Sequence, residues 1–144
     1  MKTVADVLDH TGATNVHWVP PIATVFDAIR IMSERHVGAL PVIQDRTLVG
    51  IISERDYARK VILKDKSSKT TRVSEIMTPD VVTVSLADRV EECISLMKRH
   101  HIRHLVVVEE GQVVGMVSLR DLFSEIIDEQ AETIVQLEHY IRGQ

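Results

Sequence analysis

The chain has 144 residues, a formal net charge of −4 and 44% hydrophobic residues, few of which are aromatic. This composition predicts one compact unit, or two small halves that share an aliphatic core. The acidic balance and the lack of a long basic run argue against duplex nucleic acid or an anionic membrane as the main partner. No segment reaches the roughly 20 apolar residues of a membrane span, and no signal peptide begins the sequence, so we expect a cytoplasmic protein.

An internal repeat organises the sequence. Residues 16–57 align with residues 81–122 without a gap, and 13 of the 42 aligned positions are identical. A weaker similarity relates residues 4–8 to residues 73–77, and a longer loop, 9–15, follows the first of these leads. The predicted division is a first repeat with its helical lead at 1–63, a solvated linker at 64–72, a second repeat at 73–128 and a C-terminal helix extension at 129–144.

Each copy is predicted to fold as strand, helix, strand, strand and helix, because apolar runs, helical spacing and polar turns follow in the same order. In the first copy we expect a strand at 16–19, a helix with Val25, Ile29 and Met32 on one face, strands at 39–43 and 48–52, and a helix from Ser53. In the second copy we expect a strand at 81–84, a helix with Val90, Ile94 and Met97 on one face, strands at 105–108 and 113–117, and a helix from Ser118. The polar residues 44–47 and 109–112 predict hairpins with four-residue turns.

The end of the chain predicts a further helix over residues 124–141. Its apolar positions recur at spacings of three, four or seven, interrupted by Gln130: Phe123, Ile127, Ile134, Leu137 and Ile141. Such a stripe fits a helix that packs back on its own domain and a helix that contacts a second copy equally well.

Two residues that occur once each have structural interpretations. Cys93 is the single cysteine, so an internal disulfide is excluded. Its place on an apolar helix face predicts a buried thiol. Trp18 lies where it can line a cleft or pack under the turn at Pro20 and Pro21, and packing is favoured because large residues are scarce.

A signature segment ends each copy: Gly-Ile-Ile-Ser-Glu-Arg-Asp at 50–56 and Gly-Met-Val-Ser-Leu-Arg-Asp at 115–121. With the repeat and the element order, these segments make the chain resemble a pair of cystathionine-β-synthase (CBS) domains, also called a Bateman module. The resemblance implies an α/β (α+β) fold in which two β-α-β-β-α units pack sheet to sheet around a pseudo-twofold axis, with a nucleotide cleft on each side. It also implies a homodimer that senses an adenosyl nucleotide, AMP as first choice and ATP, NAD(H) or S-adenosylmethionine as alternatives, and regulates a separate effector protein.

The Ser-x-x-Asp pairs have a structural and a functional interpretation. Ser53 with Asp56, and Ser118 with Asp121, have the spacing of capping residues at a helix start. A carboxylate at this place can also accept the two hydroxyls of a ribose. The two roles are compatible, and the resemblance favours the ribose for both aspartates.

Arginines precede both aspartates. Arg55 and Arg120 are either solvated helix residues paired with acids or contacts to a phosphate at a helix N-terminus, and the sequence leaves both open. Arg59 and Lys60 follow one turn later, where a solvated face is expected. The resemblance places the adenine at the starts of the first strands: Val16, His17, Val81 and Val82.

The two copies differ at the strand after the first helix, where Arg103 and His104 align with Gly38 and Ala39. In relatives, basic residues here contact phosphate across the cleft, so the resemblance assigns Arg103 and His104 to the cleft of Asp56. The other cleft would meet Gly38 and Ala39 and lack this charge. We therefore expect one phosphate-binding cleft and one roomier cleft for a different ligand or none.

Metal binding and catalysis are not expected. His100, His101 and His104 span a helix end and a strand start, where their rings diverge, and no zinc-type spacing is present. The sequence has no candidate nucleophile–base pair and no Gly-rich phosphate loop. The alternative to a nucleotide sensor is an interaction scaffold with vestigial clefts, assembled through its sheet or its terminal helix.

Overall fold

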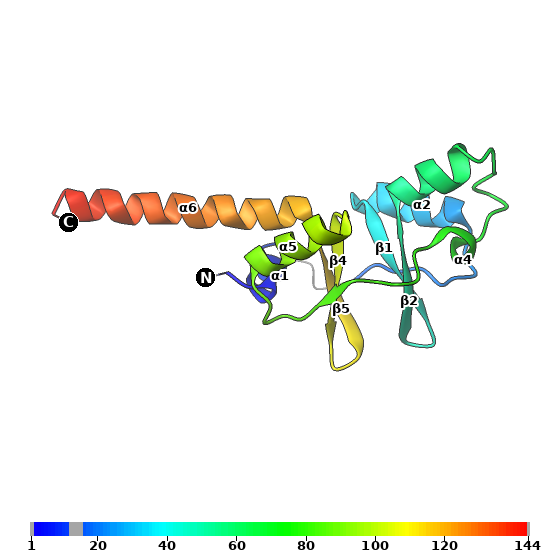
Figure 1. Cartoon of the computed structure of the whole chain (residues 1–144), viewed down its shortest axis with the longest axis horizontal. Helices are drawn as coiled ribbons and strands as arrows, with labels where there is room; N and C mark the ends of the chain where they lie inside the picture. The colour runs from blue at the N-terminus through cyan, green and yellow to red at the C-terminus, as the bar shows by residue number, and fades with distance from the viewer. Residues whose placement is uncertain (1, 12–15, 144) are drawn as a thin grey trace.

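Two β-hairpins lie side by side at the centre of the structure, with helices packed around them (Figure 1). This computed structural model describes residues 2–11 and 16–143. In the first half, β1 (Ala39–Gln44) pairs with β2 (Thr47–Ser53), and in the second half β4 (His104–Glu109) pairs with β5 (Gln112–Ser118). The short strand β3 (Thr83–Val84) joins β4 in parallel. The halves meet where β2 contacts β5, which confirms the predicted tandem arrangement of mixed helices and small sheets.

The helices of the two halves occupy matching places in the chain. They are α1 (Val4–Thr11), α2 (Val25–Arg35), α3 (Glu54–Tyr57), the π-helical turn η1 (Ala58–Ile62), α4 (Val73–Ile76), α5 (Val90–His100) and α6 (Leu119–Ile141). Both α2 and α5 end at a left-handed histidine, His36 and His101, whose N–H donates to the carbonyl of Met32 or Met97. This left-handed C-cap ends the helix and directs the chain into the following strand in the same way in both halves.

The hairpin turns are two residues long, so the predicted four-residue turns are wrong. Gln44 pairs with Thr47, which leaves only Asp45 and Arg46 outside the ladder, and residues 110–111 form the same turn in the second half. Asp45 and Arg46 have φ angles of 51° and 63°. Two successive left-handed residues match the twist of a hairpin. The polar, exposed ends of the strands made the turns look longer in the sequence.

The first predicted strand of each copy is also shorter than expected. In the first copy only Val19 pairs, with Val42, instead of the whole of 16–19. The next hydrogen bonds in the two directions would need the N–H groups of Pro41 and Pro21, which proline lacks. The second copy has no proline at the matching positions, and there β3 covers two of the four residues predicted.

Each half receives the helical lead that precedes the other half. Val4, Val7 and Leu8 of α1 pack into the core formed by β4, β5 and α5, whereas Val73 and Ile76 of α4 pack into the core of the first half. The predicted leads are confirmed as helices. Each lead packs on the half that lies on the other side of the predicted linker at 64–72. The predicted division therefore describes the order of segments along the chain and stays a prediction.

The glycine of each signature segment lies where a lead crosses the sheet. A Cβ atom at Gly115 would lie 2.8 Å from Cδ1 of Leu8, and one at Gly50 would lie 2.6 Å from Sδ of Met77. A side chain at either position would therefore have to displace the side chain of Leu8 or Met77. These glycines have a packing role that does not depend on any ligand.

Several local predictions can be compared with the structure. Cys93 is buried as predicted, and burial raises the pKa of its thiol to about 11. Trp18 is 49% exposed, so its predicted packing is wrong. Thr71 is buried and its carbonyl accepts the N–H of Val25 over 2.9 Å, so the end of the linker caps α2 instead of being solvated. In the predicted loop 9–15, residues 9–11 belong to α1 and the others lie outside the described residues.

Helix α6 runs on well past the second half and projects from the molecule (Figure 1). Every residue from 131 to 143 is exposed, so the option that the terminal helix packs back on its own domain is wrong. None of the described helices, α6 included, has the length and apolar character needed to cross a membrane.

Candidate functional site

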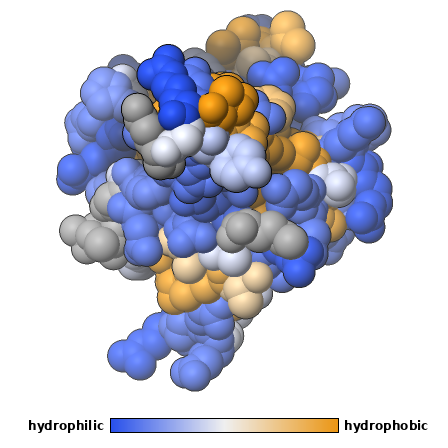
Figure 2. Space-filling view, turned by 90° about the vertical axis from the view of Figure 1, so that its left-hand side faces the viewer, coloured by the Kyte–Doolittle hydropathy of each residue, from blue (hydrophilic) through white to orange (hydrophobic). Residues whose placement is uncertain are grey.

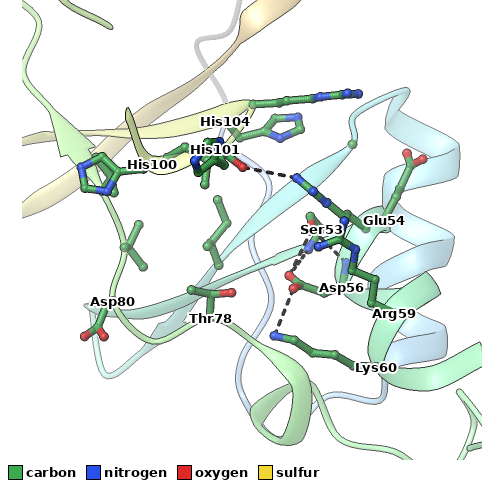
Figure 3. A pocket seen from close by; sticks show the side chains of 17 residues that line it. Ser53, Glu54, Asp56, Arg59, Lys60, Thr78, Asp80, His100, His101 and His104 are labelled. Carbon is green, nitrogen blue, oxygen red and sulfur yellow. Dashed lines mark hydrogen bonds and ion pairs between the residues drawn. The ribbon is translucent and has the colours of Figure 1, made fainter. Parts of the chain in front are cut away.

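A cavity of about 830 Å³ lies between the two halves, where the start of α3 faces the start of β4 (Figure 3). Small-molecule sites typically have volumes of roughly 300–1,000 Å³. The first half contributes one wall, the end of α5 and the start of β4 contribute the opposite wall, and residues 78–82 complete the lining. The lining residues are Gly38, Ile51, Ser53, Glu54, Arg55, Asp56, Arg59, Lys60, Thr78, Asp80, Val81, Val82, His100, His101, Ile102, Arg103 and His104.

Asp56 is fixed in this cavity by the helix cap that its spacing predicts. The backbone N–H and the hydroxyl of Ser53 donate to Oδ2 of Asp56 over 3.0 and 3.1 Å. In return, the N–H of Asp56 donates to Oγ of Ser53 over 3.1 Å, which completes a capping box. The cap uses Oδ2 of the carboxylate and leaves Oδ1 for another partner.

That partner is Lys60. Its Nζ lies 3.1 Å from Oδ1 of Asp56 and donates to the carbonyl of Ile76 over 2.9 Å. Lys60 therefore links the capped aspartate to the end of α4. Both Arg59 and Lys60 line the cavity. Arg59 is exposed, as expected for a solvated face, whereas Lys60 is partly buried and binds Asp56 and the carbonyl of Ile76. The helix changes from α to π geometry at Ala58, and such a change alters the direction of the side chains that follow.

The second half supplies the opposite wall. The guanidinium of Arg55 donates to the carbonyl of His101 over 3.3 Å and so reaches from one wall to the other. Figure 3 shows His100 and His101 on the side of the cavity opposite Asp56 and Lys60.

His104 differs from the cationic group that the sequence predicts. Burial lowers its pKa, and nearby Arg103 acts in the same direction, while the carboxylate of Asp121 partly opposes the shift. A Cβ atom at Gly38 would lie 3.3 Å from the His104 ring, so the ring is held against this glycine. His104 is therefore neutral at pH 7 and can exchange hydrogen bonds with a ligand, but the positive charge at this strand comes from Arg103.

The cavity combines hydrogen-bond acceptors with an excess of permanent cations. Its cationic side chains are Arg55, Arg59, Lys60 and Arg103, and its acidic ones are Glu54, Asp56 and Asp80. This arrangement suits a ligand that carries hydroxyl groups at one end and an anionic group at the other. Within residues 2–11 and 16–143, no three His, Cys, Asp or Glu side chains are grouped so that they could hold a metal ion.

The structure brings most of the predicted site residues together. Those that line the cavity are Gly38, Ser53, Arg55, Asp56, Val81, Val82, Arg103 and His104. Those that do not are Val16, His17, Ala39, Ser118, Arg120 and Asp121. Gly38 was expected in the other cleft, but it lies in this one because it packs against His104. Ala39 was also expected to face the other cleft, but it is fully buried.

In the segment between α4 and β3, sequence reasoning named Val81 and Val82 but missed Thr78 and Asp80. The N–H of Ile51 donates to the carbonyl of Thr78 over 3.0 Å, and the N–H of Thr78 donates back over 2.9 Å. This pairing lays Thr78 and Asp80 along the cavity. The local pattern gives no sign of it, because it depends on the exchange of the helical leads between the halves.

Asp121, the second capped aspartate, has the same kind of cap as Asp56, but the residue one turn later is different. The N–H of Ser118 donates to Oδ2 of Asp121 over 3.0 Å, and the N–H of Asp121 donates to Oγ of Ser118 over 3.1 Å. The position that matches Lys60 holds Glu125, which is buried and lies 2.7 Å from Nδ1 of His10 and 3.7 Å from Nζ of Lys2.

Known proteins are similar to this chain over most of its length. The family model described as CBS domain matches residues 4–63 and 73–128. The mitochondrial CBS domain-containing protein CBSX3 of Arabidopsis thaliana is 36% identical over 149 residues, which cover 98% of this chain and 72% of that protein. The CBS domain-containing protein YhcV of Bacillus subtilis is 34% identical over 85% of this chain and 84% of its own length.

Solved structures agree with these relatives. A CBS-domain protein of Burkholderia ambifaria matches with a TM-score of 0.86 and 41% identity, over 90% of this chain and 96% of that one. The repeat, the exchanged leads and the two capped aspartates thus occur in a chain that belongs to the CBS domain family and contains two CBS domains in tandem.

Proposed function

We propose that this CBS pair senses an adenosyl nucleotide in the cavity at Asp56 and signals its presence to a separate effector protein. CBS pairs are regulatory modules, and the proposal specifies what this one binds. The observation that carries it is the Asp56 carboxylate, which Ser53 fixes at the edge of a cavity that also contains Arg103.

The ribose is proposed to bind at Asp56. Oδ2 is committed to the helix cap, so the ribose hydroxyls would donate mainly to Oδ1, which now contacts Lys60. A hydrogen bond to a charged acceptor contributes about 1.5–3 kcal/mol. Lys60 also holds the carbonyl of Ile76, so a ligand at Asp56 would weaken the link between η1 and α4. This link is a route by which binding can change the shape of the module.

The anionic end of the ligand is proposed to lie near Arg103, with Arg55 and Arg59 close to it. AMP fits this arrangement as the first choice, and ATP and NAD(H) extend the same chemistry with further phosphates. S-adenosylmethionine is the alternative without a phosphate. The CBS domain pair of protein MJ0100, which has a TM-score of 0.74 and 24% identity to this chain, has been solved with 5′-methylthioadenosine and S-adenosylmethionine. These two compounds are therefore useful probes.

The remaining parts of the proposal concern assembly and location. We propose that two copies form a homodimer and that the protein acts in the cytoplasm, although the Arabidopsis relative is named as mitochondrial. Related structures include a hexameric CBS-CP12 protein from cyanobacteria, so assembly occurs among proteins of this fold.

A thermal-shift series tests the ligand. The purified protein is heated with AMP, ADP, ATP, NAD, NADH, 5′-methylthioadenosine or S-adenosylmethionine, each tested at increasing concentrations. A ligand at 100 times its dissociation constant should add about 2.7 kcal/mol to the free energy of unfolding. Asp56→Ala should abolish the shift for the phosphorylated ligands, whereas Asp121→Ala, which removes an equivalent cap in the other half, should retain it.

Both substitutions remove a capping carboxylate and so affect the stability of the protein itself. The thermal midpoint of each variant without ligand is therefore the reference from which its ligand shift is measured. A ligand shift that survives Asp56→Ala, or that disappears equally in both variants, would contradict the proposed site. If no compound raises the midpoint and none is found with the purified protein by mass spectrometry, the function is not nucleotide sensing at this cavity.

The second candidate is an interaction scaffold. The observation in its favour is α6, whose apolar residues Ile134, Leu137 and Ile141 are more than half exposed. An enzymatic role has no such support. The inosine-5′-monophosphate dehydrogenase of Methanocaldococcus jannaschii is 34% identical over 79% of this chain, but the match covers only 22% of that enzyme.

A further inference from the structure

The exposed part of α6 carries a narrow apolar seam. Its residues repeat in steps of four and three from Phe123 to Ile141, and their exposed fractions lie between 49% and 80%. In heptad order, the a positions hold Ile127, Ile134 and Ile141, and the d positions hold Phe123, Gln130 and Leu137. Figure 2, viewed towards the C-terminal end of α6, shows hydrophobic atoms at the surface beside this end of the helix.

The seam extends beyond the face that α6 uses within its own domain. Leu122 and Glu125 are buried, and Leu119 and Ile126 pack against the core of the second half. At about 100° per residue, Leu122 and Glu125 lie roughly 100° or more from the middle of the seam, and Leu119 and Ile126 lie at its edge. Every residue from 131 to 143 is exposed, so the seam continues where the helix has left its own domain. A helix that serves only its own domain has one broad apolar stripe, whereas a strict a and d seam is typical of a coiled coil.

The residue types specify what covers the seam. The seam has isoleucine at its three a positions and leucine at one of its three d positions, Leu137. Isoleucine at a with leucine at d favours two parallel helices. The positions on either side of the seam hold Ser124, Ile126, Ala131, Thr133 and Tyr140, with Glu138 as their only acid. Two such helices can therefore approach without opposing like charges. Gln130 would lie opposite Gln130 in a parallel pair in register, where the two amides can bond to each other. In an antiparallel pair centred on the seam it would face Ile134.

We infer that the α6 helices of two copies of this chain form a short parallel coiled coil through Phe123, Ile127, Gln130, Ile134, Leu137 and Ile141. This interface rests on the proposed homodimer and names its surface. The seam has fewer than three heptads, which is short for an isolated coiled coil. Here the capping box at Ser118 and the packing of Leu122 already hold the helix in place, so association does not require its nucleation.

Two matched substitutions on one turn test the seam. Ile134 and Val135 are exposed to similar degrees, 56% and 51%, but only Ile134 is in the seam. Light scattering after size exclusion gives the molar mass in solution. Ile134→Asp should halve it, whereas Val135→Asp should leave it at the wild-type value. Equal masses for wild type and Ile134→Asp would overturn the α6 interface. If that shared mass is a dimer, the proposed homodimer survives on another surface, and if it is a monomer, both proposals fail.

Disulfide cross-linking tests the register. Gln130→Cys should form a covalent dimer under mild oxidation, and Val135→Cys should remain monomeric on a non-reducing gel. The native Cys93 gives little background because it is buried. Equal cross-linking of the two variants would overturn the seam. Failure of Gln130→Cys to cross-link, together with a disulfide between Phe123→Cys and Ile141→Cys chains, would overturn the parallel arrangement. If added phospholipid vesicles, or a helical peptide from another protein, abolish the Gln130→Cys cross-link, the seam prefers that partner and the proposed coiled coil is overturned.

Discussion

The two halves of the molecule share a cap and differ one turn later. In both halves the serine N–H lies 3.0 Å from Oδ2 of the aspartate. In the first half the next turn carries Lys60, which binds the free oxygen of Asp56 and a carbonyl of α4. In the second half Glu125 takes this position and turns to His10 and Lys2. The capped carboxylate of the first half thus binds a cation one turn later, whereas the matching position of the second half holds a carboxylate that binds other partners.

The aligned positions just before β1 and β4 also differ in charge. Arg103 gives a permanent positive charge to the cavity of Asp56, whereas its counterpart Gly38 has no side chain. The two repeats thus share the helix cap and differ in the charged residues around it. We therefore expect the capped aspartates to have different ligand preferences.

Among the positions at which the two halves differ, the largest effect is expected from Arg103. Arg103→Ala should weaken AMP binding about tenfold, because a hydrogen bond to a charged group contributes about 1.5–3 kcal/mol and this arginine is partly solvated. Binding of 5′-methylthioadenosine, which has no phosphate, should not change. Isothermal titration calorimetry with each ligand measures both dissociation constants.

Arg46→Ala, at the exposed tip of the first hairpin, is the matched control and should bind AMP like the wild type. If Arg103→Ala weakens both ligands equally, the guanidinium does not contact the phosphate. If two sites are titrated and both lose the same affinity, the two halves are equivalent and the proposed asymmetry is wrong.

A smaller effect is expected from the caps. Ser53→Ala and Ser118→Ala should each lower the free energy of unfolding by about 1 kcal/mol, because each removes one capping acceptor. Urea denaturation without ligand measures the loss, and Ser33→Ala, at an exposed position within α2, should have little effect. Equal losses would support energetic equivalence of the two caps. A loss at only one serine would mean that their matching geometry does not make them equivalent.

Much of the fold is predictable from the sequence because it depends on local patterns. The repeat, the apolar faces of α2 and α5, both hairpins and the capped helix starts follow from spacing within about a dozen residues. The errors arose where a distant residue decides the outcome. Pro41 shortens the pairing of Val19, although it lies more than 20 positions away in the sequence.

The candidate site was predicted less completely. Ser53, Asp56, Arg103 and His104 were expected in one cleft, and they line one cavity. The lowered pKa of His104 could not be predicted, because it depends on how deeply the ring is buried. The position of Lys60 depends on a π-helical turn that no residue pattern indicates.

The smallest effect is expected at His10 of α1, which binds Glu125 of the second half. The hydrogen bond and the charge of Glu125 raise the pKa of His10, with Asp128 acting in the same direction and burial and Lys2 opposing it. A raised pKa means that protonated His10 stabilises the fold. This contribution is complete below the pKa of the unfolded chain and is lost as the pH rises through the higher pKa of the folded state. The difference in urea midpoint between wild type and His10→Gln should therefore favour the wild type at pH 5.5 and shrink towards pH 8.5. The effect should be small because the His10 side chain is 55% exposed, and a difference that grows with pH would contradict this role of Glu125.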